Sequence, residues 1–280
     1  MKHSPRSAVR FVALFVLGCA ASCGDGKTAA PPTPASSMTD AEYVRRFHAG
    51  VVELEQHRFL DAAKTFGELT KDRPRNLAAW INLAEAELNR NTPESHPAVE
   101  AAVAGALAVD PEDPQAHFIR GILHKHLGEF EQAEARFRAA LKKAPEDPTL
   151  NYQLATVLPP ERSEEAIVLL ETCLAGQTHL SSAYYRLAEV KGRTDRDART
   201  VALAAFKTFE DAETGNKAGI VYTEMGRLGE ARRDPGVVLP PPPVAAAPAS
   251  FTNAALQTGR VAATAARRVN IVEASGRRAS

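Results

Sequence analysis

The tetrapeptide Pro-Glu-Asp-Pro occurs twice in this chain, at residues 111–114 and again at 145–148. The two copies begin 34 residues apart, and Pro74 lies 37 residues before the first. Four residues can recur by chance, so the residues between the copies decide whether this spacing is a structural period. A period of this length is typical of stacked repeats, in which each unit is one supersecondary element.

The residues between the two copies have the pattern of a helix, a tight turn and a second helix. Gly121 is small enough for the two helices to approach closely, and Gly128 can take the left-handed conformation that ends the first helix. Pro145 cannot continue the second helix. Asp147 can cap the next helix, with Pro148 at its first position, where the missing N–H is not needed. The apolar residues expected to fill the space between units are Phe130, Phe137 and Leu141.

This pattern resembles the tetratricopeptide repeat (TPR), a 34-residue helix-turn-helix unit. The template matches five consecutive units over about residues 43–210, more than the three or so that bury a continuous core. The resemblance implies an all-α, right-handed solenoid, which we expect to end in a capping helix at 216–233 with a charged face. The fifth unit matches least well. If its helices paired with 216–233 instead, the array would be one helix out of phase from Ser181 onward.

The N-terminus has the pattern of a secretory signal, with basic residues before an apolar run at 11–18 that is too short to span a bilayer. The run leads into Val-Leu-Gly-Cys19, which resembles the lipobox of bacterial lipoproteins, whose cysteine receives a diacylglycerol and becomes the mature N-terminus. We therefore expect a lipid on Cys19, with Cys23 as the alternative. The competing interpretation is an ordinary cleavable signal with incidental cysteines. A lipid anchor would hold the protein in the cell envelope, facing the periplasm at the outer membrane.

Composition divides the rest of the chain. We expect a signal peptide at 1–18, a flexible tether at 19–38, the solenoid with its capping helix at 39–233, a proline-rich linker at 234–250 and a disordered Ala/Arg-rich tail at 251–280. Cys173 lies among leucines and is interpreted as a small core residue. With one cysteine lipidated, no disulfide framework is expected.

Charge and motifs exclude several classes of function. Residues 39–250 contain 25 basic and 32 acidic side chains, and this acidic balance argues against nucleic acid as the partner. The sequence contains no phosphate-binding loop, nucleophile elbow, zinc-protease motif or Cys-x-x-Cys pair, so no enzyme activity and no cofactor are expected. His117 and His124 share a helix face, but no third ligand lies at metal-binding spacing. We interpret both as solvated helix histidines.

In this family the first helix of each unit lines a concave groove. One groove position is apolar or aromatic in all five units, which suits an extended or helical polypeptide. The predicted groove residues are Phe47, Val51, Ile81, Glu85, Phe118, Ile122, Lys125, Tyr152, Thr156, Tyr185 and Glu189. The alternative is that some of these rings pack between helices. The carboxylate clamp of chaperone-tail binders is not implied, because only Asn82 is kept at its positions.

The resemblance predicts a non-enzymatic scaffold. It would be a membrane-anchored TPR lipoprotein that binds a protein or peptide partner in its groove, in envelope assembly, secretion or polysaccharide export. The alternative is a recruiting or N-terminal module of a larger enzyme or propeller-containing system encoded downstream.

Overall fold

The computed structural model describes residues 37–219 and 222–239. The chain divides into two compact units, Met1–Pro235 and Gly236–Ser280, and only residues 236–239 of the second are described. The predicted signal sequence with Cys19 and Cys23, most of the tether, most of the proline-rich linker and the Ala/Arg-rich tail lie outside the described residues.

The described residues form ten α-helices and three short 3₁₀ turns, with no strand. The helices are α1 (Asp40–Glu55), α2 (Phe59–Asp72), α3 (Leu77–Arg90), α4 (His96–Val109), α5 (Pro114–His126), α6 (Phe130–Leu141), α7 (Pro148–Val157), α8 (Ser163–Gly176), α9 (Ser181–Lys191) and α10 (Arg196–Asp211). None of these helices is long and apolar enough to cross a membrane.

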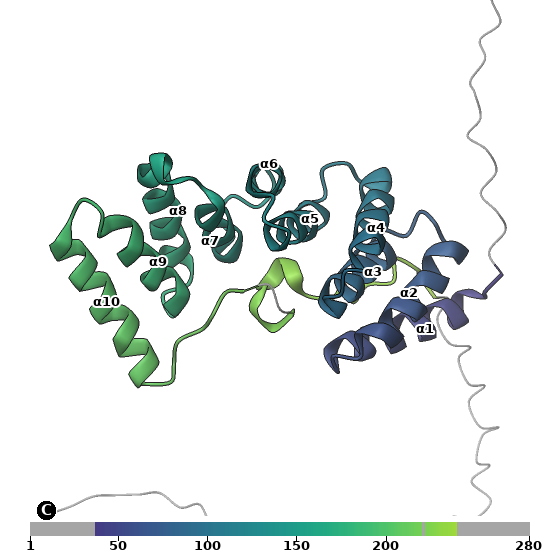
Figure 1. The fold of residues 1–280 in the computed structure, drawn as a ribbon. Helices are drawn as coiled ribbons and strands as arrows, with labels where there is room; N and C mark the ends of the chain where they lie inside the picture. Colours follow the sequence, from purple (N-terminus) through teal and green to yellow (C-terminus); the bar gives the residue numbers. More distant parts are fainter. Residues whose placement is uncertain (1–36, 220–221, 240–280) are drawn as a thin grey trace, which may run out of the picture. The chain divides into compact units, whose positions relative to one another are not determined.

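The helices pair in sequence order, α1 with α2 through to α9 with α10, and each pair packs on the next (Figure 1). The first helices of successive pairs also touch, α1 with α3, α3 with α5 and α5 with α7. This is the predicted all-α solenoid of five stacked helix pairs. The fifth pair is α9 with α10, as the repeat pattern indicated, and not a pairing with 216–233.

The first three junctions between helix pairs begin with a side-chain N-cap, whereas Leu180 before α9 provides none. Asp113 Oδ1 accepts from the Ala116 N–H at 2.8 Å, and Asp147 Oδ1 accepts from the Leu150 N–H at 2.9 Å. Asn76 caps α3 in the same way. These side chains satisfy main-chain N–H groups that a helix start leaves without partners. The two Pro-Glu-Asp-Pro copies are therefore helix starts, as predicted.

A second bond at the same three junctions has no counterpart in the sequence prediction. A side chain in the first turn of the helix donates to the carbonyl oxygen of the proline that precedes it. The three pairs are Trp80 Nε1 to Pro74 at 2.9 Å, His117 Nε2 to Pro111 at 3.0 Å and Asn151 Nδ2 to Pro145 at 2.9 Å. Three chemically different donors thus fill one repeat position, which hides their equivalence in the sequence.

Packing inside the third pair agrees with most of the pattern. A Cβ added to Gly121 would lie 2.5 Å from the Phe137 ring, so only glycine allows this approach of α5 to α6. Gly128 has φ of +77° at the turn, as expected for the residue that ends the first helix.

Phe130 departs from the prediction because its ring is half exposed. Cys173 is fully buried in the core cluster, as predicted.

The predicted capping helix at 216–233 is wrong. Residues 216–219 and 222–235 contain only two 3₁₀ turns, Tyr222–Glu224 (η2) and Arg227–Gly229 (η3). Gly226 is the physical reason, because its φ of +65° and ψ of −164° lie in a region that glycine alone adopts readily. A Cβ there would also lie 2.3 Å from Thr149 Oγ1. The described residues 216–219 and 222–235 are together called the strap below.

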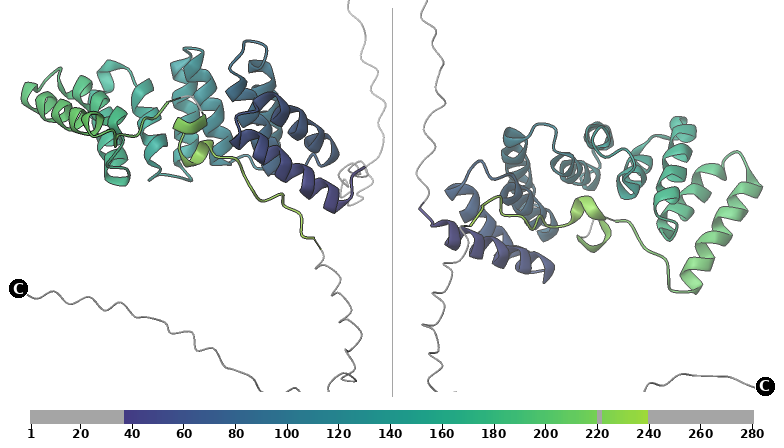
Figure 2. Two further views of the ribbon diagram at one scale, coloured as in Figure 1. Left: turned by 90° about the horizontal axis from the view of Figure 1, so that it is seen from below. Right: turned by 180° about the vertical axis from the view of Figure 1, so that it is seen from behind.

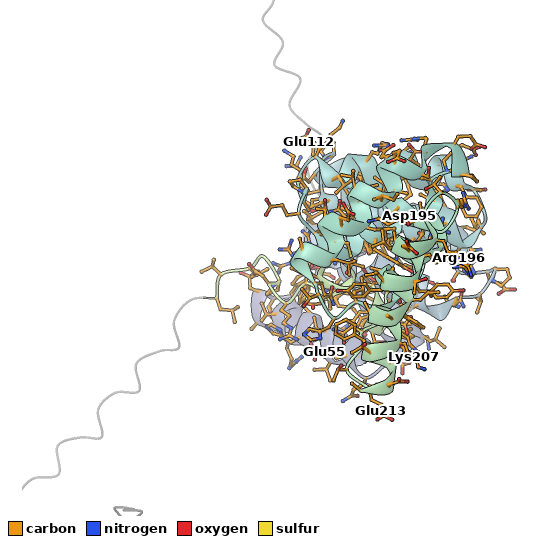
Figure 3. All side chains as sticks on the ribbon, turned by 90° about the vertical axis from the view of Figure 1, so that its left-hand side faces the viewer. Glu55, Glu112, Asp195, Arg196, Lys207 and Glu213 are labelled. Carbon is orange, nitrogen blue, oxygen red and sulfur yellow. The ribbon has the colours of Figure 1, made fainter. Side chains whose placement is uncertain are left out.

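The last helix takes the role expected of the capping helix. Figure 3 looks onto α10, whose ends and outer side carry the charged side chains of Asp195, Arg196, Lys207 and Glu213. All four are exposed. A terminal repeat needs such a polar outer face, because no further unit covers it.

Candidate functional site

The strap lies on the face formed by the first helices of the pairs, here called the first-helix face (Figures 1 and 2). It crosses this face in the direction opposite to the helix order. Its Asn216 carbonyl bonds to Ser181 of α9, and its Gly219 carbonyl bonds to Gln153 of α7. Farther along the chain, its contacts are on α5 and then α3.

Two buried amide side chains hold the main chain of the strap. Asn82 uses both ends of its amide on Arg232, donating to the carbonyl oxygen at 2.8 Å and accepting from the N–H at 2.7 Å. Gln115 Nε2 donates to the Glu230 carbonyl at 2.7 Å. Every polypeptide has these main-chain atoms, so such bonds can hold an extended segment whatever its side chains are.

Gln153 extends the same interaction to α7, and Lys125 fixes its orientation. The Gln153 Nε2 donates to the Gly219 carbonyl at 2.9 Å, while its Oε1 accepts from Lys125 Nζ at 2.6 Å. Lys125 also donates to Thr156 Oγ1 at 2.7 Å. An ammonium group can only donate, so it directs the amide nitrogen of Gln153 toward the strap. Burial, followed by the charge of nearby Arg186, lowers the pKa of Lys125 to about 8.

Three helix N-caps form a second row of contacts with the strap. Each uses one side-chain atom to cap its helix and another to reach the strap. The pairs are Asn76 Nδ2 with the Pro235 carbonyl at 2.5 Å, Asp113 Oδ2 with the Arg232 guanidinium, and Asp147 Oδ2 with Arg227 Nη2 at 3.6 Å. The junctions between helix pairs are therefore also binding positions.

Among the described residues of the strap, Arg232 makes the largest number of hydrogen bonds to the helices. Its Nε donates to Gln115 Oε1 at 2.9 Å, and its Nη2 donates to Asp113. Its main-chain N–H and carbonyl both bond to Asn82. The Asp113 side chain is buried, so the ion pair lies in surroundings that strengthen charged hydrogen bonds.

Apolar side chains of the strap complete the contact. Met225 is fully buried and Leu228 nearly so, and both belong to the main hydrophobic cluster of the helices. The Tyr222 ring lies 6.1 Å from the rings of both His57 and Phe59, at the turn between α1 and α2. The strap therefore contacts the first helix pair as well as the last.

The strap does not fill the face completely. A cavity of about 440 Å³ lies between it and the ends of α7 and α9, lined in part by Thr149, Leu180, Asn216, Thr223 and Glu224. Glu85 of α3 is fully buried, with no hydrogen-bond partner for its Oε1 in the described residues. Burial raises the pKa of the Glu85 carboxyl well above its ordinary value of 4.5.

Comparison with known proteins identifies the repeat. A sequence model of the tetratricopeptide repeat matches residues 48–95, 89–148 and 121–158. Residues 48–158 belong to the tetratricopeptide repeat family. No curated protein matches the sequence.

Solved TPR structures share the fold at low identity. MamA from Desulfovibrio magneticus RS-1, residues 41 to the end, superposes with a TM-score of 0.52 and 14% identity over 62% of this chain and 97% of its own. PilW, described as a widely conserved type IV pilus biogenesis factor, gives 0.52 and 16% over 60% and 78%. YrrB, described as a TPR protein with an unusual peptide-binding site, gives 0.50 and 12% over 62% and 87%. Identities this low establish the fold alone.

The predicted groove residues occupy three different environments on this TPR array. Phe47, Val51, Ile81, Glu85, Phe118 and Ile122 are buried. Lys125 and Thr156 are bonded to each other, and Tyr152 is partly buried beside Lys125, whose Nζ lies 5.9 Å from the ring centre. Tyr185 and Glu189 of α9 are exposed, and Glu189 pairs with Arg186. Phe118 packs on Phe137 at 6.0 Å between ring centres, inside its own helix pair.

The two histidines are not the solvated residues that the sequence predicted. His117 is buried at the junction with Pro111, and His124 Nδ1 lies 2.7 Å from Glu129 Oε2 across the turn between α5 and α6. Among the described residues, no group of three or more potential ligands is arranged to hold a metal ion. Both histidines have structural partners that account for their positions.

The sequence contained a signal for the amides that hold the strap. Asn82 and Gln153 occupy the same position of the TPR unit two repeats apart, and both bond to strap main-chain atoms. Only Asn82 stands out in the sequence alone, because it matches an asparagine of the family's carboxylate clamp. Gln115 and the second contacts of the N-caps had no comparable pattern, since they depend on partners far away in the sequence, 115 residues for Gln115 and Glu230.

Proposed function

We propose that this protein is a non-enzymatic, membrane-anchored scaffold whose first-helix face binds an extended segment of a partner polypeptide in the cell envelope. The observation that carries the proposal is the strap. Buried amides on α3, α5 and α7 bond to its main-chain atoms, so the face has the groups needed to hold an extended chain.

The fold supports a protein-binding role. YrrB and PilW share the fold, and their descriptions name a peptide-binding site and pilus biogenesis respectively. Assignment of this chain to envelope assembly, secretion or polysaccharide export rests on the sequence of its N-terminus. The Val-Leu-Gly-Cys19 motif after the apolar run supports lipidation and placement at the periplasmic face of the outer membrane.

Site-specific photocrosslinking in cells tests the binding face. Tyr185 of α9 is 48% exposed on a first helix, and Val168 of α8 is 61% exposed on a second helix. A benzophenone amino acid replaces each in turn in the full chain. We expect position 185 to crosslink to an envelope polypeptide and position 168 to give no such product. Crosslinks from position 168 only, or from neither position, would contradict the proposal.

Replacement of the lipidation site tests the anchor. Cys19→Ala should move the protein from the membrane fraction to the soluble fraction and lower its mass by that of the lipid. Cys23→Ala is the matched control and should change neither. An unchanged membrane fraction with both cysteines replaced would remove the anchor from the proposal.

A further inference from the structure

The strap shows which side chains the first-helix face selects, in addition to the main chain that it holds. Three strap residues are held through their side chains by buried parts of the repeat. Met225 and Leu228 enter the hydrophobic cluster, and the Arg232 guanidinium bonds to Asp113 and Gln115. Their neighbours Arg227 and Arg233 have side chains that are 74% and 78% exposed, so the face does not accept every basic residue equally.

The backbone adds a fourth requirement. Gly226 follows Met225 with φ of +65°, and its Cα lies so close to Thr149 that a Cβ would overlap Oγ1. A side chain at this position is excluded both by the conformation and by the lack of space. The strap therefore presents the pattern Met-Gly-x-Leu followed by arginine four residues after the leucine.

We propose, building on the function above, that the partner segment has this same chemistry: a peptide with an apolar residue, a glycine that takes a positive φ before a 3₁₀ turn, a second apolar residue three positions after the first, and an arginine four positions later. The strap is the intrachain copy of that segment. The partner and the strap bind at the same atoms of Asn82, Gln115 and Asp113, so they exclude each other.

Tethering makes the strap a strong competitor. A segment joined to its own binding face by a short linker has an effective concentration of about millimolar. A free peptide must exceed this to bind the intact chain. The free peptide should bind readily once the side chains that hold the strap in place, such as Met225 and Leu228, are replaced. Truncation of a buried anchor costs about 10-fold in affinity or more, so the contribution of Arg232 is measurable in a peptide.

The test uses a fluorescein-labelled synthetic peptide of residues 222–235 and fluorescence anisotropy with the purified full chain. The chain is compared as wild type and as the opened variant Met225→Ser/Leu228→Ser. We expect the peptide to bind the opened variant at least about 10-fold more tightly than wild type. A peptide with Arg232→Ala should lose at least about 10-fold in affinity, and the matched peptide with Arg233→Ala should stay within about 3-fold.

Each other result contradicts a defined part of the account. If the opened, folded variant binds the Arg232→Ala peptide and a scrambled peptide as well as the native one, the sequence pattern is overturned while peptide binding by the face stands. If it binds none of them, the proposed function fails as well. Equal binding to wild type and to the opened variant overturns the competition.

A second variant covers the case in which the first does not fold. Gly226→Ala alters only the strap, and its helical circular dichroism shows whether the repeat is intact. If both variants lose their helical signal, the strap is a part of the folding core that no partner can replace, and the proposal is overturned.

Discussion

Two kinds of contact stabilise the helical array: the bonds at the junctions between helix pairs, and the bonds between the helices and the strap. They differ in the sequence distance that they span. At a junction, Asp147 caps the helix three residues on, and Asn151 reaches back six residues to Pro145. In the strap, Asn82 bonds to Arg232 across 150 residues. Local bonds leave a repeated pattern in the sequence. Distant bonds leave none, which is why the sequence pattern predicts a helix where the strap lies.

Three N-caps link the two regions, and Asp113 is the clearest example. Asp113 caps α5 with one carboxylate oxygen and binds the Arg232 guanidinium with the other. The repeat therefore needs no dedicated binding residues at this position, because a structural cap also has an acceptor left for a ligand. From this difference we expect substitutions in the repeat core to lower the free energy of unfolding most. Substitutions in the strap should lower it less and disturb only the strap.

The largest effect is expected from Phe118→Ala. The ring is fully buried and packs on Phe137, so its loss leaves a cavity and should lower the free energy of unfolding by about 3–5 kcal/mol. Tyr185→Ala, at the same repeat position in the exposed fifth unit, is the control and should cost less than about 1 kcal/mol. Urea denaturation measures both. Equal costs would mean that Phe118 is not core.

Arg232→Ala should have the next largest effect, because it removes a charged hydrogen bond to buried Asp113. We expect a loss of about 1.5–3 kcal/mol in the free energy of unfolding. The adjacent Arg233→Ala removes an exposed pair with Glu55 and should change it by less than about 1 kcal/mol. Thermal denaturation of the two variants compares them, and the reverse order would place the anchor of the strap elsewhere.

Glu85→Gln should stabilise the chain at neutral pH. Burial raises the pKa of Glu85 well above 4.5, so the folded chain keeps this proton over a pH range in which the unfolded chain has lost it. The free energy of unfolding therefore falls as the pH rises above 4.5. Glutamine carries no charge and should gain about 1–3 kcal/mol at pH 7, with a flatter pH profile. A variant less stable than wild type at pH 7 would show that the carboxylate has a favourable partner.

His117→Asn is expected to have the smallest effect and concerns the junction alone. Burial lowers the pKa of His117 below 6.5. As the pH drops below that value, this imidazole is protonated more readily in the unfolded chain than in the folded one, so the free energy of unfolding falls. Asparagine should keep the bond to Pro111, as Asn151 does to Pro145, and should remove this acid dependence while changing stability at pH 7 by less than about 1 kcal/mol. The exposed His126→Asn serves as the control, and unfolding curves between pH 5 and 7 compare the three proteins.

The sequence was sufficient for most of the helices because the first three junctions each contain a side-chain cap and a preceding proline. Asp147, Pro148 and Gly128 each act within their own few residues, so their roles could be predicted without the fold. Residues 216–233 contain charged and apolar residues in a pattern that favours a helix, and a single glycine at position 226 was not enough to indicate otherwise. The position of that glycine against Thr149 depends on α7, which no local pattern describes.

The candidate site was predicted only in part for a similar reason. The first helices were correctly expected to form one face, but large apolar residues such as Phe118 were assigned to it by position alone. Their contacts separate them from the amides that reach the strap, because Phe118 packs on Phe137 inside its own helix pair. Gln115 and Gln153 are polar residues that also suit an exposed helix surface, so their role appears only when the opposing segment is in place.

Hydrogen exchange of the full chain, followed by mass spectrometry, tests the central claim most directly. The Arg232 N–H donates to Asn82 and the Ala231 N–H donates to Tyr222. A peptide fragment covering residues 225–235 should therefore exchange at least about 10-fold more slowly than an unstructured segment. Asn82→Ala should speed its exchange while α5 to α8 keep their protection. Exchange of this fragment at the unstructured rate in the wild-type chain would contradict the claim that the first-helix face holds the strap.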